Sequence, residues 1–207
     1  MGGIALFGGT FDPLHYGHLR MLETLAKQTF ISSVIIIPNY IAPHKAKSRT
    51  PAKDRSSMVK ATIKALSKKF PQKSFKVSEF EIKKQSISWT IDTVNKIKNT
   101  YSEQDIYFVI GSDSYFAFHT WKDYLGILGI VKLIVVNRHN NLDKAEYRQY
   151  YEKHLKTIPF NNLVFLEHSA IEISATELRQ MLKKGQDISE FVPNYIADYI
   201  KQRGLYR

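Results

Sequence analysis

Residues 3–18 read Gly-Ile-Ala-Leu-Phe-Gly-Gly-Thr-Phe-Asp-Pro-Leu-His-Tyr-Gly-His, and this stretch decides the fold. It begins with an apolar run of strand length at residues 4–7, which is followed by Gly8 and Gly9. Two glycines at the end of a strand let the backbone turn tightly and approach a ligand, because no Cβ stands in the way. A helical spacing of apolar residues then begins at Leu19. This order of strand, glycine turn and helix predicts a phosphate-binding loop.

His15 and His18 lie at the start of the predicted helix, three residues apart, so both rings can point at one group of phosphates. The helix N-terminus adds free N–H groups and about half a positive charge. Gly17 leaves room for a ligand between the histidines. A histidine pair at this spacing could instead bind a metal ion, with Asp12 as the only local third ligand. The position after a strand and a glycine turn favours phosphate, although neither a dinucleotide fingerprint nor a Walker A spacing is present.

Short apolar runs alternate with helical patterns along the rest of the chain. Predicted strands cover residues 4–7, 34–37, 106–110, 131–136 and 163–166, with a weaker one at 75–77. Helical spacing occurs at residues 19–26, 58–66, 91–97 and 178–182, with Gly185 as a helix stop and a last helix from about 193 to 203. This pattern predicts one α/β domain over residues 1–207, built on a doubly wound, mostly parallel sheet with helices on both faces. Ligands of such sheets bind beyond the carboxyl ends of the strands.

The composition is that of an ordinary globular protein, with 43% hydrophobic and 24% charged residues. No apolar run reaches the ~18 residues of a membrane span, and the first residues do not resemble a signal peptide. The sequence has no cysteine, which excludes disulfides, thiolate nucleophiles and cysteine-based zinc sites. These features favour a cytoplasmic location and no membrane partner.

The formal net charge of +11 allows two interpretations. A basic surface attracts polyanions, so a nucleic-acid-binding module is one hypothesis. The basic residues are scattered, however, as Lys60, Lys64, Lys68 and Lys69 are on one predicted helix. We therefore favour solvated faces with a smaller excess of positive charge around a phosphate-binding cleft, and expect no specific nucleic-acid partner.

Motifs spread over the whole chain make the sequence similar to known enzymes. Residues 8–18 carry the first motif, and Ile-Ser-Ala-Thr-Glu-Leu-Arg at 173–179 is similar to an I-S-S-T-x-I-R phosphate motif. Between them lie Ser-Trp-Thr-Ile-Asp-Thr at 88–93 and Ile-Gly-Ser-Asp at 110–113, followed by Phe118 and Trp121. With these motifs the chain resembles the H-x-G-H nucleotidyltransferases, and most closely the bacterial nicotinate-nucleotide adenylyltransferases.

The resemblance implies a Rossmann-like nucleotidyltransferase fold and a reaction of NAD biosynthesis. ATP would transfer its adenylyl group to nicotinate mononucleotide, giving nicotinate adenine dinucleotide and pyrophosphate. Direct in-line transfer is expected, with Mg²⁺ bound mostly through phosphate oxygens and by no protein side chain. The alternatives are the same chemistry on nicotinamide mononucleotide or another phosphate acceptor, and more distantly a basic nucleic-acid-binding module. A homo-oligomer is compatible with the sequence.

The resemblance also implies roles for residues that bind ATP. His18 would donate to an α-phosphate oxygen, while His15 and Lys45 would steady the β and γ phosphates. Lys45 lies in a polar loop of residues 39–51, where a plain solvated lysine is equally compatible with the sequence. Helices at about 174–203 would complete the site. The other residues expected to bind ATP are Gly8, Gly9, Thr10, Phe11, Gly17, Gly111, Asp113, Ile173, Ser174, Thr176 and Arg179.

The acceptor is expected to bind beside two tryptophans. Trp121 would stack on the pyridine ring, and its structural alternative is core packing against Phe116 and Phe118. Thr90 and the adjacent backbone amides would bind the acceptor's carboxylate. The full set expected to bind the acceptor is Trp89, Thr90, Trp121 and Arg138.

Structural alternatives also exist for the polar residues of the ATP site. Asp113 would hold ribose hydroxyls, but a helix N-cap is the alternative. Ser174 and Thr176 could cap their helix, with Glu177 as the capping partner, or bind phosphate oxygens. Arg179 could be a solvated helix charge, although a bidentate phosphate clamp fits the resemblance better.

Overall fold

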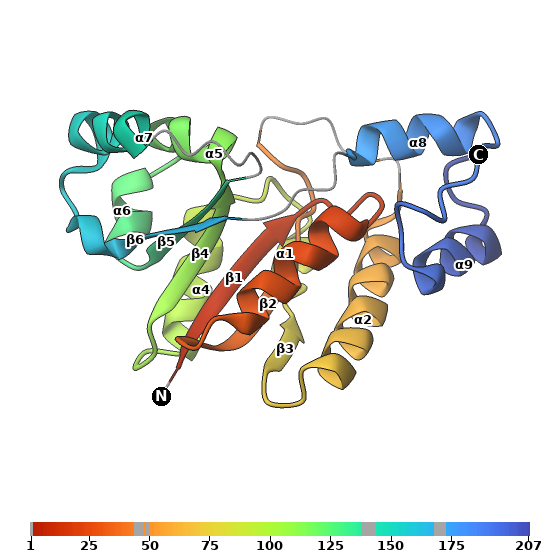
Figure 1. Ribbon diagram of the computed structural model, residues 1–207, viewed down its shortest axis with the longest axis horizontal. Coiled ribbons are helices and arrows are strands. Elements are labelled where there is room, and N and C mark those ends of the chain that lie inside the picture. The colour runs from red at the N-terminus through yellow and green to blue at the C-terminus, as the bar shows by residue number, and fades with distance from the viewer. Residues whose placement is uncertain (1, 44–47, 49, 138–143, 168–172) are drawn as a thin grey trace.

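The protein folds around one six-stranded parallel sheet with the strand order β3-β2-β1-β4-β5-β6 (Figure 1). This computed structural model describes residues 2–43, 48, 50–137, 144–167 and 173–207. The strands are β1 (Gly3–Gly9), β2 (Ile31–Pro38), β3 (Ser74–Val77), β4 (Ile106–Gly111), β5 (Lys132–Asn137) and β6 (Leu163–Glu167). All six runs predicted as strands are therefore confirmed, including the weaker one at 75–77.

Helices cover both faces of the sheet (Figure 1). One face, called the α1 face, carries α1 (Tyr16–Lys27), α2 (Ala52–Lys69), α8 (Ala175–Lys183) and α9 (Asn194–Arg203). The opposite α4 face carries α4 (Thr90–Thr100), α5 (Ser112–Phe116), α6 (Tyr124–Leu128) and α7 (Lys144–Tyr150). A short α3 (Phe80–Lys84), a π turn at Tyr151–Leu155 and two 3₁₀ turns at Phe118–Thr120 and Phe160–Asn162 complete the described elements. None of the helices described is long and apolar enough to span a membrane.

The strands are apolar throughout because each one is buried on both sides. In β2, Val34 and Ile36 pack into the core of the α1 face, while Ile35 and Ile37 pack into that of the α4 face. Successive side chains of a strand point to opposite faces, so a strand covered on both sides needs apolar residues at every position. The near-continuous apolar runs of the sequence follow from this arrangement.

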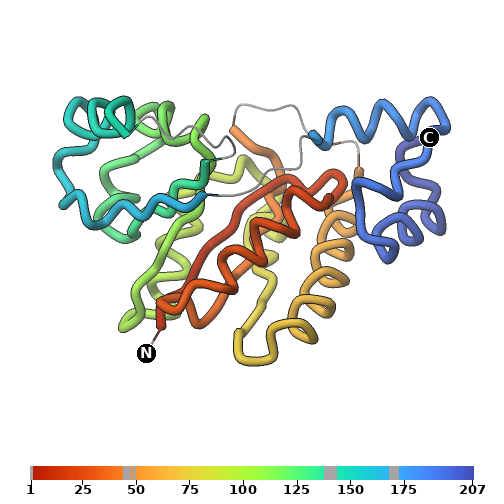
Figure 2. Tube along the Cα trace, viewed as in Figure 1, coloured from red at the N-terminus to blue at the C-terminus, as the bar shows by residue number. Residues whose placement is uncertain are grey.

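The order of the strands places a crevice at the carboxyl end of β1. β1 pairs with β2 on one side and with β4 on the other. Connections to β2 pass over the α1 face, whereas the chain reaches β4 through α4 on the opposite face. Loops on either side of β1 therefore diverge and leave a crevice between them. Ligands of this type of sheet usually bind in such a crevice. Near the end of the sequence, α8 lies at this end of the sheet and α9 packs beside α2 (Figure 2).

Candidate active site

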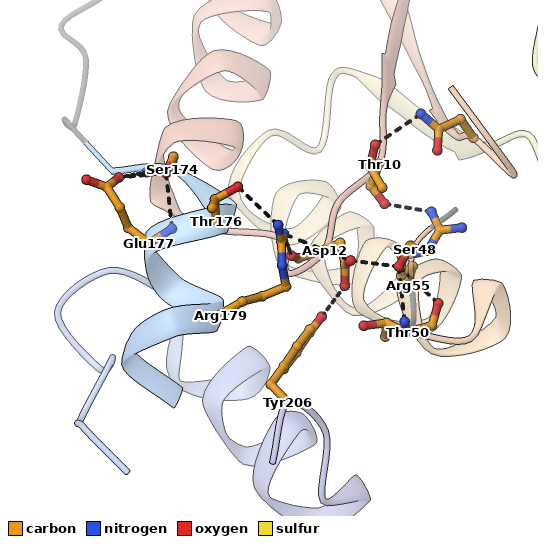
Figure 3. Close-up of polar contacts among 11 residues, drawn as sticks. Thr10, Asp12, Ser48, Thr50, Arg55, Ser174, Thr176, Glu177, Arg179 and Tyr206 are labelled. Atoms are coloured by element: carbon orange, nitrogen blue, oxygen red, sulfur yellow. Dashed lines mark hydrogen bonds and ion pairs between the residues drawn. The ribbon is translucent and has the colours of Figure 1, made fainter. Parts of the chain in front are cut away.

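A cleft of about 950 Å³ opens where β1 ends and α1 begins. Its walls come from four parts of the chain that are far apart in sequence. The lining residues are Gly9, Thr10, Phe11, Asp12, His15 and His18; Asn39 to Ala42, Ser48, Thr50 and Pro51; Ile173 to Thr176, Arg179 and Lys183; and Gly204 to Arg207. The predicted phosphate loop and the predicted start of α8 are thus brought together on one cleft (Figure 3).

The two glycines of the loop serve different purposes. A Cβ on Gly9 would lie 2.8 Å from Cζ of Phe11, because the phenyl ring packs directly against this glycine. Phe11 itself is 1% exposed and has a positive φ of 50°, an uncommon conformation for a bulky residue. A Cβ on Gly8 would meet no atom within 4 Å. The open space at Gly8 is compatible with the close approach of a ligand, whereas Gly9 is needed for internal packing.

Replacing Gly9 with alanine is expected to lower the free energy of unfolding by about 1–3 kcal/mol, since the new methyl group overlaps the Phe11 ring. The matched variant Gly8→Ala is expected to leave the stability nearly unchanged, because its methyl group would enter open space. Urea denaturation of both variants and the unchanged protein measures the difference. Equal unfolding free energies for the two variants would contradict the assignment of Gly9 to packing.

His15 and His18 form a compact pair at the beginning of α1. His15 is the N-cap residue, it is 7% exposed, and the centres of the two rings lie 3.9 Å apart. The backbone N–H of His15 donates to Nδ1 of His18 across 3.4 Å. Because Nδ1 accepts, the neutral His18 ring carries its proton on Nε2, where it can be donated. Both rings line the cleft, as their spacing in the sequence predicted.

The start of α8 combines a local cap with a link to the loop. Ser174 is the N-cap: its Oγ accepts from the Glu177 backbone N–H, and Glu177 Oε2 accepts from the Ser174 backbone N–H at 2.7 Å. Hydrogen bonds from Ser174 lower the pKa of Glu177. The capping interpretation is therefore confirmed for Ser174, whereas Thr176 does not cap; its Oγ1 accepts from Arg179 at 3.0 Å.

Arg179 joins α8 to the predicted phosphate loop, residues 10–18. Its Nη1 donates to the carbonyl oxygen of Asp12 at 2.7 Å, a contact that spans 167 residues of sequence (Figure 3). The same atom lies 3.9 Å from the Asp12 carboxylate. The guanidinium group lines the cleft together with Lys183 and Arg207, so cationic side chains dominate this wall. Such a surface suits a polyanion.

The loop is supported by Ser48, Arg55 and Tyr206, and the sequence argument gave none of these three a role in the site. Asp12 is 6% exposed; its Oδ2 accepts from Ser48 at 2.6 Å and its Oδ1 accepts from Tyr206 at 2.8 Å. Arg55 is 1% exposed, and its Nη1 donates to the Thr10 carbonyl oxygen at 2.7 Å. Burial lowers the pKa of Arg55, and the nearby Asp12 carboxylate opposes that shift.

Two of the expected acceptor residues, Trp89 and Thr90, lie next to a wall of the cleft without lining it. Tyr40 and Ile41 line the cleft, and Ser88 is hydrogen-bonded to both: its N–H donates to the Ile41 carbonyl at 2.9 Å, and its Oγ accepts from the Tyr40 N–H at 3.0 Å. Trp89, the N-cap residue of α4, and Thr90 follow directly. These contacts place the start of α4 next to the cleft.

Trp121 has features of both of its predicted alternatives. The centre of its ring lies 5.0 Å from that of Phe118 and 6.0 Å from that of Phe108, and the residue is partly exposed. Core packing against Phe118 is confirmed, and no ring contact with Phe116 is present within the described residues. The exposed part of the ring is available to a ligand. Lys122, the next residue, places its Nζ 4.9 Å from the centre of the Trp89 ring.

Other predicted residues lie outside the cleft. Gly111 ends β4 and is the N-cap of α5, so the alternative that Asp113 caps this helix is wrong. Within the described part of the chain, the cleft lining does not include Gly8, Gly17, Gly111, Asp113, Trp89, Thr90 or Trp121. Lys45 and Arg138 lie outside the described residues.

Comparisons with known proteins show the family and the fold of this chain. The profile of the cytidylyltransferase-like family matches residues 6–181. The nicotinate-nucleotide adenylyltransferase of Salmonella typhimurium is 35% identical over 98% of both chains, and a probable one from Citrobacter koseri matches equally well. Among solved structures, Plasmodium falciparum nicotinic acid mononucleotide adenylyltransferase complexed with NaAD superposes with a TM-score of 0.79 at 22% identity, covering 100% of this chain and 98% of that chain. This last likeness shows a shared fold.

Proposed function

This chain belongs to the nicotinate-nucleotide adenylyltransferase family, and we propose that the cleft at the carboxyl end of β1 binds the ATP from which it transfers the adenylyl group. The enzyme joins this group to nicotinate mononucleotide, a step of NAD biosynthesis. An oxygen of the acceptor's 5′-phosphate bonds to the α-phosphorus of ATP, and the bond from that phosphorus to the leaving pyrophosphate breaks. The observation that carries the proposed site is the meeting of the histidine pair with Arg179 on one cleft.

In this proposal, His18 donates from Nε2 to an oxygen of the α-phosphate, where negative charge increases in the transition state. His15 and Arg179 bind the β and γ phosphates, and Lys45 is proposed to do so as well. Because both histidines are held by the start of α1, little reorganisation is needed when the phosphates bind. Catalysis is then mainly positioning and charge stabilisation, as expected for transfer at phosphorus.

Mg²⁺ is proposed to arrive with the triphosphate and to neutralise part of its charge. In the described residues, no group of three or more histidine or acidic side chains is placed to hold a metal ion. Asp12 is the one carboxylate of the described cleft lining, and both of its oxygens already accept hydrogen bonds. The donor set therefore suits a cation bound mostly through phosphate oxygens.

The acceptor is proposed to bind beside the start of α4. Trp121 and Trp89 offer aromatic surface to the pyridine ring, and Thr90 with its adjacent N–H groups suits the carboxylate. Asp113 is proposed to hold ribose hydroxyls and Arg138 to contact the acceptor. The single domain and the cytoplasmic location remain predictions from the sequence. A homo-oligomer is compatible with that sequence.

Product analysis tests the reaction and the acceptor together. The protein is incubated with ATP, Mg²⁺ and either nicotinate or nicotinamide mononucleotide, and the products are separated. We expect dinucleotide and pyrophosphate in equal amounts, formed at least about tenfold faster from the acid, because a carboxylate binds helix N–H groups more strongly than an amide. Faster reaction of the amide would contradict the acceptor assignment, and no dinucleotide from either would contradict the proposed activity.

A further inference from the structure

Asp12 is the point at which three distant segments meet the phosphate loop. Its Oδ2 accepts from Ser48, its Oδ1 accepts from Tyr206, and its carbonyl oxygen accepts from Arg179 (Figure 3). Each of these partners lines the cleft. The Tyr206 contact spans 194 residues and comes from the last residues of the sequence. A displacement of Asp12 would therefore change several walls of the cleft at once.

The conformation at Tyr206 is strongly determined by its surroundings. Its φ is 66°, in the left-handed region that residues with a side chain rarely adopt. Such a conformation persists only where the surrounding contacts fix it. Burial, together with the negative charge of Asp12, raises the pKa of Tyr206 far above its ordinary value. The hydroxyl consequently keeps its proton and donates a hydrogen bond to the carboxylate.

We propose that Tyr206 is a positioning residue for ATP: its hydroxyl holds the Asp12 carboxylate and so keeps the loop of residues 10–18 in the shape that receives the phosphates. This inference rests on the proposed function, in which ATP occupies the cleft. Tyr206 acts through Asp12, which precedes His15 by three residues and whose carbonyl anchors Arg179. The last residues of the sequence thereby help to hold the loop that receives the triphosphate.

A second tyrosine–aspartate pair provides a matched control. The Tyr199 hydroxyl donates to Oδ1 of the buried Asp54 at 2.8 Å, and Arg203 donates to the same oxygen at 3.0 Å. This pair joins α9 to α2, as Tyr206 joins the end of the chain to the loop. Neither Tyr199 nor Asp54 belongs to the cleft lining among the described residues. Loss of either hydroxyl removes one donor from a buried carboxylate, but only one of the two carboxylates belongs to the phosphate loop.

The test compares Tyr206→Phe with Tyr199→Phe. Binding of an ATP analogue with a methylene group between its α and β phosphorus atoms is measured by calorimetry with Mg²⁺ present. We expect Tyr206→Phe to weaken this binding about tenfold, the usual scale for losing a hydrogen bond to a charged group. The KM for nicotinate mononucleotide should stay within about twofold of the unchanged enzyme. Tyr199→Phe should lower the melting temperature with little change in analogue binding.

Several outcomes would overturn the proposal. A dissociation constant of Tyr206→Phe for the analogue that stays within twofold of that of the unchanged protein would overturn it. An equal loss of analogue affinity in Tyr206→Phe and Tyr199→Phe would overturn it as well. If Tyr206→Phe melts near the assay temperature, the titrations are repeated at 10 °C, and Ser48→Ala tests the other oxygen of Asp12 with the same expected direction. If the unchanged protein binds the analogue but forms no dinucleotide, the proposed function fails while the role of Tyr206 is still measured. Absence of binding to the unchanged protein would overturn both.

Discussion

Replacement of His18 with alanine is expected to lower kcat by a factor of about 10² to 10³, the usual effect of removing a donor that stabilises transition-state charge. The centre of the His18 ring lies 3.9 Å from that of His15 and 5.1 Å from that of Phe11. Its Nδ1 accepts from the backbone N–H of His15. Nε2 is then the nitrogen that carries the proton of the neutral ring and can donate it in a hydrogen bond. Because charge on the α-phosphate increases only during transfer, the KM for ATP should change much less than kcat.

Steady-state formation of dinucleotide measures this effect. His18→Gln retains an N–H donor on a side chain of similar reach, so its kcat should lie between those of alanine and histidine. His154→Ala is the matched control: this histidine stacks on His119 on the α4 face, and its variant should keep kcat within about twofold. Near-normal turnover by His18→Ala, with an unchanged melting temperature, would show that another residue stabilises the α-phosphate.

Replacement of Arg55 with methionine is expected to lower the free energy of unfolding by about 2–4 kcal/mol. Arg55 is fully buried, and it donates to the Thr10 carbonyl while facing the charge of Asp12. Methionine fills a similar volume, but it leaves the Thr10 carbonyl oxygen without this donor, and of the two cations near the Asp12 carboxylate only Arg179 remains. The resulting decrease in melting temperature should be about 5–15 °C for a chain of this size.

A surface arginine separates this effect from a general loss of charge. Arg20 of α1 is exposed, and Arg20→Met should change the unfolding free energy by less than about 0.5 kcal/mol. Urea denaturation compares both variants with the unchanged protein. If the unfolding free energy of Arg55→Met lay within about 1 kcal/mol of that of the unchanged protein, Arg55 would be a minor contributor. The loop would then be supported mainly by Asp12 and Tyr206.

Features encoded within one short segment were predictable from the sequence. The strands were found because burial on both faces requires apolar residues at every position, and such runs are visible without any partner. His15 and His18 were found for a similar reason, since the period of the helix alone brings their rings together. The N-cap at Ser174 also depends only on residues within one turn.

The supporting residues of the site could not be found in this way. Arg55 stands between polar neighbours in the first turns of α2, where the sequence is typical of a solvated helix face. It is buried next to the loop that follows β1, where it donates to the Thr10 carbonyl oxygen and interacts with Asp12 and Tyr206. Gly9 was predicted to allow close approach of a ligand; it lines the cleft, and the structure adds that its lack of a side chain also makes room for the ring of Phe11. Local patterns do not show which distant group will cover a residue.

The sequence by itself determined the sheet, the glycine turn after β1, the histidine pair and the family, because these depend on local periodicity or on motifs of adjacent residues. Only the tertiary structure decided how the loop is held. The contacts of Asp12 with Tyr206 and Arg179 span 194 and 167 residues, and that of Thr10 with Arg55 spans 45. A buried carboxylate or guanidinium is stable only where partners meet it in space, and folding alone brings those partners together.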